Sequence, residues 1–134
     1  MAHETLLLNG KVRSLTHLEI EIVFRAMIRA IETECMHDLD AVADEWKRGL
    51  ASIDVGLVDI ELEPHFCGRG GAARLAALID QGQSMIRTDV AEVPIEDLNG
   101  QLGTRIDGTN ATIDRRVIDE GFEKLTSLVQ DVAA

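Results

Sequence analysis

The stretch THLEIEIVFRAMIRAIETECMHDLDAVADEW, residues 16–46, decides how this chain folds. It contains neither glycine nor proline, and Thr16 followed by Glu19 is a capping box that marks the start of a helix. Large apolar side chains then recur at steps of mostly three and four residues, which places them on one helical stripe. These positions are Ile20, Phe24, Met27, Ile28, Ile31, Cys35, Leu39, Val42 and Trp46. The pattern predicts helix up to Gly49, with the Cys35 thiol buried on the stripe.

Two arrangements of this stretch are open. One is a single helix of about 32 residues, and the other is two helices bent near His37 and Asp38. The single helix would span roughly 48 Å, whereas a compact chain of 134 residues has a diameter of about 36 Å. An unbroken helix would extend beyond the molecule, and its apolar stripe would need a second copy to cover it. On this argument we expect a homodimer.

Short elements flank the helical stretch. Residues 5–13 carry the turn pair Asn9-Gly10, which is typical of a short hairpin or of a strand that ends in a turn. Residues 53–62 alternate apolar and acidic side chains with one change of parity, which predicts a strand, with a bulge, that ends at Pro64. Residues 72–79 read as a helix that stops at Gly82. Residues 83–108 are ambiguous and include a possible short strand at 102–106.

The C-terminal segment repeats apolar residues at helical spacing from residue 113 to residue 132. We expect Thr109 and Asn110 to cap this helix, and Glu120 to pair with Lys124 one turn later. Gly121 lies inside the helix, so either a neighbouring backbone packs against it or the helix ends nearby.

Together these patterns predict an α+β, mostly helical fold. It has an N-terminal hairpin, a long helix, one or two strands and a packed C-terminal helix, in a single domain over residues 1–134. Apolar residues make up 46% of the chain, which excludes a wholly disordered protein. No apolar run is long enough to span a membrane, and the first residues lack the basic region of a secretory signal. Two cysteines make no disulfide framework, so we expect a cytoplasmic protein.

The charge balance restricts the partners. There are 24 acidic and 13 basic residues, which gives a net charge of −11. Such a field repels nucleic acids and anionic membranes, so neither is an expected partner. It suits a basic protein partner, or it serves solubility alone.

A glycine-rich loop is the clearest candidate for a ligand site. Residues 55–79 read as a strand, a glycine loop and a helix, and backbone N–H groups at a helix start attract phosphate and other anions. The spacing is neither that of the dinucleotide-binding GxGxxG motif nor that of the P-loop. Arginine side chains near the loop would add positive charge. The candidate ligand-binding residues are Cys67, Gly68, Arg69, Gly70, Gly71, Arg74 and Arg105.

The same loop, LEPHFCGRGGA at residues 62–72, resembles the acyl-CoA loop of the GNAT acetyltransferases. Gly70 and Ala72 match the last two positions of that family's motif, and Cys67 stands where Gln or Arg is expected. Further positions similar to the family are Asn110, Gly121 and Phe122. The resemblance implies a site for the pyrophosphate of CoA on the loop amides. The chain has no tyrosine for the usual general acid, and the preceding strands are not found, so the family is not assigned.

Two weaker chemical patterns remain. Glu34 and His37 have the Glu-x-x-His spacing of di-iron helix bundles, but no second such motif occurs. Cys67 close to His65 at a helix start could be an activated nucleophile, although no residue that orients the pair can be named. No catalytic set is complete, and we expect no bound cofactor.

These observations favour a binding or inhibitory accessory protein whose acidic face engages a basic protein partner. Immunity proteins, antitoxins and phage-encoded inhibitors have this general character. The alternative is a small-molecule binding protein or an acyltransferase-like enzyme, in which the loop from Gly68 to Gly71 holds a nucleotide, CoA or another phosphate-bearing ligand.

Overall fold

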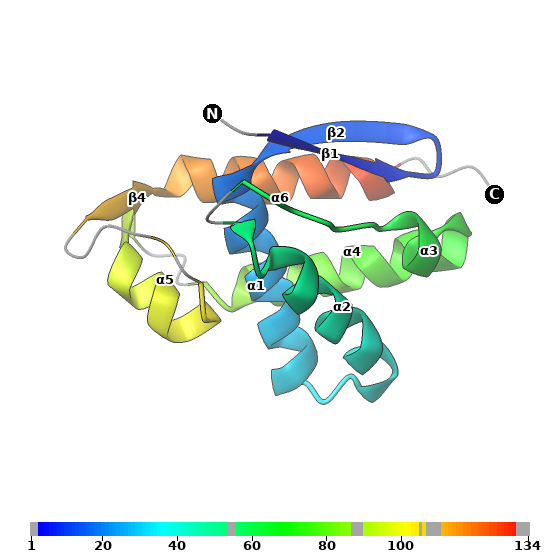
Figure 1. Cartoon of the computed structure of the whole chain (residues 1–134), viewed down its shortest axis with the longest axis horizontal. Coiled ribbons are helices and arrows are strands. Elements are labelled where there is room, and N and C mark those ends of the chain that lie inside the picture. The colour runs from blue at the N-terminus through cyan, green and yellow to red at the C-terminus, as the bar shows by residue number, and fades with distance from the viewer. Residues whose placement is uncertain (1–2, 54–55, 87–89, 105, 107–110, 131–134) are drawn as a thin grey trace.

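The computed structural model describes residues 3–53, 56–86, 90–104, 106 and 111–130. Over these residues the chain is mostly helical, with two small antiparallel strand pairs, as the α+β prediction requires (Figure 1). None of the helices in the described ranges is long and apolar enough to cross a membrane.

The predicted N-terminal hairpin is confirmed. Strands β1 (His3–Leu8) and β2 (Lys11–Thr16) pair antiparallel, with Leu8 opposite Lys11 beside the turn. Asn9 and Gly10 both have positive φ, 51° and 82°, which is the conformation of a tight hairpin turn. The apolar residues on the inner face are buried, and Leu7 and Val12 form an exposed cross-strand pair on the outer face.

The helical stretch is two helices, not one. Helix α1 (His17–Thr33) starts at the predicted capping box, in which Thr16 and Glu19 bond each other's backbone N–H. A 3₁₀ turn, η1 (His37–Leu39), then leads into α2 (Asp40–Leu50), which packs back against α1 (Figure 1). The long helix is therefore 17 residues, and the length argument for a homodimer fails.

The break has a specific cause at Cys35. This residue adopts φ of +53°, and the Met36 N–H donates to the Ile31 carbonyl at 3.0 Å, which is the bond of a Schellman helix end. Met36 packs against the core as the usual apolar contact of that motif. Cys35 itself is exposed, so its expected burial was wrong.

The expected strand at residues 53–62 is absent from its described part. Residues 57–62 run as a stretched, unpaired segment (Figure 1). The predicted alternation of buried and exposed side chains is present, because Ile60 and Leu62 are buried while Asp59 and Glu61 are exposed. Helix α3 (Glu63–Phe66) follows, and then α4 (Gly68–Ser84), which passes through Gly82 instead of stopping there.

The remaining elements clarify the ambiguous region. Strands β3 (Glu92–Pro94) and β4 (Thr112–Asp114) pair antiparallel and flank α5 (Ile95–Leu102). The possible strand at 102–106 is wrong, because Leu102 ends α5 and Gly103 is its left-handed cap. Helix α6 (Arg115–Val129) is the predicted C-terminal helix, but Asp114 caps it. The expected caps Thr109 and Asn110 lie outside the described residues.

Helix α1 lies at the centre of the core and contacts α2, α4, α5 and α6. Gly82 and Gly121 allow α4 and α6 to pack closely against α1. A methyl group on Gly82 of α4 would lie 3.1 Å from the Met27 side chain, and one on Gly121 of α6 would lie 3.0 Å from that of Val23. The helix interior at Gly121 therefore packs against side chains of α1.

An ion pair between a buried carboxylate and a half-buried lysine joins α1 to α6. Lys124 Nζ lies 2.8 and 3.0 Å from the two carboxylate oxygens of Glu19, which is 4% exposed. Lys124 thus pairs with Glu19 and not with the expected Glu120. Burial by itself would raise the pKa of Glu19, but hydrogen bonds from Lys124 and Thr16 outweigh it and hold the pKa below its ordinary 4.5.

We predict that Lys124→Met lowers the free energy of unfolding by about 1–3 kcal/mol at pH 7, because it leaves a buried carboxylate without its cation. The folded-state pKa of Glu19 is depressed, so the pair stabilises the fold above pH 4.5 and loses this effect as the pH falls through the folded pKa. Urea denaturation between pH 7 and pH 3 should show the deficit shrinking towards acid pH.

Lys47→Met is the matched control. Lys47 Nζ lies 2.8 Å from a carboxylate oxygen of Glu32, but both side chains are more than 40% exposed. Such surface pairs contribute about 0–1 kcal/mol. If Lys47→Met lost as much free energy of unfolding as Lys124→Met, burial of Glu19 would not make its ion pair more important for stability than a surface pair.

Candidate binding groove

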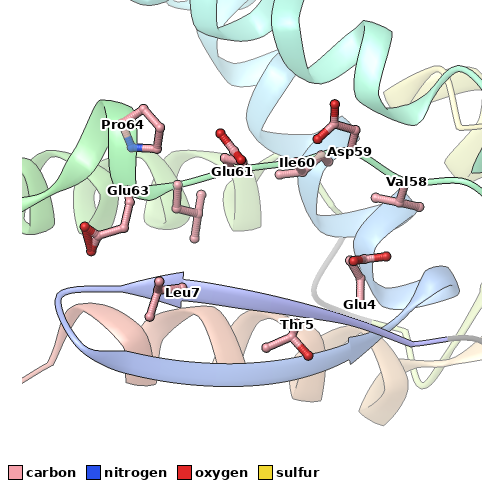
Figure 2. Close-up of a pocket in the computed structure, with 10 residues that line it drawn as sticks. Glu4, Thr5, Leu7, Val58, Asp59, Ile60, Glu61, Glu63 and Pro64 are labelled. Atoms are coloured by element: carbon pink, nitrogen blue, oxygen red, sulfur yellow. The ribbon is translucent and has the colours of Figure 1, made fainter.

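A groove of about 380 Å³ lies between strand β1 and the stretched segment that follows α2 (Figure 2). One wall is formed by Glu4, Thr5 and Leu7, and the other by residues 58–64. No aromatic side chain lines it, unlike most pockets for small molecules. We call it the acidic groove, because Glu4, Asp59, Glu61 and Glu63 are among its lining residues.

The wall formed by β1 is an open strand edge. Across a two-residue turn, Leu8 and Lys11 form a hydrogen-bonded pair, and the pairs alternate from there along the hairpin. Leu8, Leu6 and Glu4 therefore direct their backbone N–H and C=O groups to β2, whereas those of Thr5 and Leu7 point to the groove. Between β1 and residues 56–62, all of which the structure describes, no backbone hydrogen bond forms.

The opposite wall is fixed at both ends. At the first, the Asp59 N–H donates to the Gly49 carbonyl at 3.1 Å, and Gly49 lets the two backbones touch at the end of α2. At the second, the Asn9 N–H of the hairpin turn donates to the Glu63 carboxylate. The segment thus runs beside β1 without pairing with it.

The charge of the groove has one sign. Glu4 and Glu63 project from the two walls into the space between them, whereas the Asp59 and Glu61 side chains leave the segment on the side away from β1 (Figure 2). No lysine or arginine is among the lining residues, all of which are described. His17 approaches Glu4 with 3.9 Å between Nε2 and Oε2.

The two basic residues of β2, Lys11 and Arg13, do not point towards the acidic groove. Lys11 Nζ donates to the backbone carbonyl of Gln130, and Arg13 Nε donates to Ser127 Oγ at 2.7 Å. Both contacts hold these side chains of β2 over α6 and away from the β1 edge. The groove therefore presents carboxylates beside unpaired backbone groups.

The candidate ligand loop is not a loop. Cys67 precedes α4 as an exposed residue, and Gly68, Arg69, Gly70 and Gly71 form the first turn of that helix. A methyl group on Gly71 would lie 2.4 Å from the Phe66 backbone, so this glycine serves the tight α3–α4 junction.

Two of the groups proposed to bind phosphate already have partners within the protein. The Gly68 N–H donates to Asn9 Oδ1 at 2.7 Å, and Arg74 forms an ion pair with Asp38. Arg105 lies outside the described residues. A phosphate site at the start of α4 stays an untested prediction.

The other chemical patterns also fail to assemble in the described residues. The strand that precedes the turn in GNAT acetyltransferases is replaced by an unpaired segment and α3. His37 is exposed and lies 3.2 Å from Asp40, and no three potential metal-binding side chains gather in the described part of the chain. His65 bonds Glu45 at 2.7 Å and so has a partner other than Cys67.

A comparison of the chain with protein families, curated proteins and solved structures finds no match. The groove itself was not anticipated from the sequence. Its one advance signal was the acidic stretch after Gly49, in which no lysine or arginine occurs before Arg69. The contribution of Glu4, Thr5 and Leu7 depends on which hairpin edge faces that stretch.

We predict that Gly49→Ala displaces the segment wall and destabilises the fold by about 1–3 kcal/mol. The added methyl group would lie 2.0 Å from the Asp59 carbonyl oxygen, which cannot be accommodated without movement. Urea denaturation gives the stability, and backbone NMR shifts at Asp59, Ile60 and Glu61 report the displacement.

Gly100→Ala, in α5, is the control. This glycine has no heavy atom within 4 Å of an added methyl group and no positive φ. Its replacement should stabilise the helix by about 0.5–1 kcal/mol. A Gly49→Ala protein as stable as the wild type would show that the contact does not hold the segment.

Proposed function

We propose that this chain is a small acidic accessory protein that binds a basic protein partner and inhibits it by occupying its surface. The observation that carries the proposal is the acidic groove, whose lining includes carboxylates from β1 and from residues 59–63 and no lysine or arginine, although Arg48 lies with Asp59 in an adjoining hollow. A surface of one sign favours partners of the opposite sign and penalises like-charged ones.

The charge of the whole chain supports the same role. A net charge of −11 attracts a basic partner over a distance of about 10 Å at ordinary ionic strength and raises the association rate. The groove then supplies the local contacts. We propose that the protein acts in the cytoplasm, where its free Cys35 and Cys67 thiols would stay reduced.

Neutralising the groove is the direct test. In the groove variant, Glu4→Gln, Asp59→Asn and Glu61→Gln remove three negative charges, and in the control variant Asp44→Asn, Asp80→Asn and Glu123→Gln remove three exposed charges elsewhere. A partner recovered from extracts of the source cells is identified and purified, and its Kd is measured against salt concentration for all three chains.

We expect a basic partner whose Kd rises steeply with salt for the wild type. The groove variant should bind at least about tenfold more weakly, which corresponds to about 1.4 kcal/mol, and the control variant close to the wild type. Salt-independent binding, or equal weakening in both variants, would remove the groove as the site.

A further inference from the structure

We propose that the acidic groove takes up an extended segment of the basic partner as an additional strand on the open edge of β1. The inference rests on the proposed function and specifies how the partner is held. Main-chain hydrogen bonds to a sheet edge supply affinity in this mode, and alternate side chains supply specificity.

The backbone of β1 provides the docking groups. Thr5 and Leu7 point their N–H and C=O groups into the groove, and no backbone hydrogen bond from residues 56–62 satisfies them. These residues are spaced as alternate positions of one strand, so an extended segment can pair with both at once. Because their side of the hairpin is not part of the β1–β2 ladder, pairing there leaves the hairpin intact.

The side chains of β1 specify the chemistry of the occupant. Glu4 lies on the hairpin face opposite to that of Leu7, because successive strand residues alternate between faces. Leu7 and its cross-strand neighbour Val12 are 49% and 53% exposed and form an apolar pair beside the edge. An occupant with alternating basic and apolar residues would therefore place its cations towards Glu4 and its apolar side chains beside Leu7.

The opposite wall adds to this selection. Glu63 projects into the groove, and the exposed Asp59 and Glu61 on the far side of the same segment add to its negative field (Figure 2). A second copy of the chain is a poorer occupant, because it also carries a net charge of −11 and its own β1 edge lies beside Asp59, Glu61 and Glu63, so the two acidic grooves would repel each other. Charge complementarity thus selects a basic strand over self-pairing.

The test uses the full chain and a capped hexapeptide of alternating lysine and valine as the probe. Two further peptides carry backbone N-methyl groups, on all lysines in one and on all valines in the other. In an added strand only one of these sets donates its N–H groups to β1. Kd values are measured for the wild type, the groove variant and the control variant, and amide hydrogen exchange is followed by NMR.

We expect one N-methylated peptide to bind at least about tenfold more weakly than the parent and the other to change less than about threefold. The Thr5 and Leu7 amides should become protected from exchange on binding, whereas Leu6 and Leu8, already in the hairpin ladder, should change little. The groove variant should lose the peptide, and the control variant should retain it.

Each contrary result has a distinct meaning. Equal effects of the two N-methylated peptides, with binding still lost in the groove variant, would overturn strand addition and leave the acidic groove as the binding site. Equal binding to the groove and control variants would overturn both proposals. If the peptide does not bind, the inference is overturned. If protection of the Thr5 and Leu7 amides grows with protein concentration in the absence of peptide, the inference is also overturned, and the β1 edges of two copies pair with each other.

Discussion

The burial of α1 is the constraint from which the rest of the structure follows. Nearly all of its apolar residues are fully buried, so other elements must cover it on most sides. Helices α4 and α6 approach it closely at Gly82 and Gly121, where any larger side chain would meet α1. The same close packing buries Glu19, whose carboxylate is stabilised by Lys124 of α6 and by the cap of its own helix. Packing, capping and charge pairing are thus coupled at the start of one helix.

This coupling also sets the position of the groove. Strand β2 ends at Thr16, which is itself the cap of α1, so the hairpin cannot reorient without breaking the capping box. With its inner face packed over α6, the hairpin leaves the outer edge of β1 open. The segment after α2 is held in place by the Gly49–Asp59 contact and lies opposite that edge. The groove is therefore a consequence of the core, not of a flexible surface.

Local signals in the sequence predicted the elements better than their junctions. The Asn9-Gly10 turn and the capping box at Thr16 act over a few residues, and both were confirmed. The sequence left open whether the helical stretch is one helix or two bent near His37 and Asp38, because the helix end at Cys35 uses a non-glycine residue with positive φ and an apolar contact from Met36, and no glycine or proline marks it. Residues 57–62 show why alternation alone does not make a strand, since it indicates one buried face but not a hydrogen-bonded neighbour. The groove depends on such long-range placement, which no local pattern contains.

Open strand edges are an aggregation hazard, and charged side chains beside them are a common protection. The carboxylates around β1 suit that purpose, because two copies of this chain would repel each other at the edge. Protection by charge of one sign is selective, however. The arrangement that excludes another acidic edge attracts a basic one, since the backbone groups of Thr5 and Leu7 remain available to either. A protective function and a recognition function therefore require the same residues, and they differ only in whether a strand of opposite charge is present to pair with the edge.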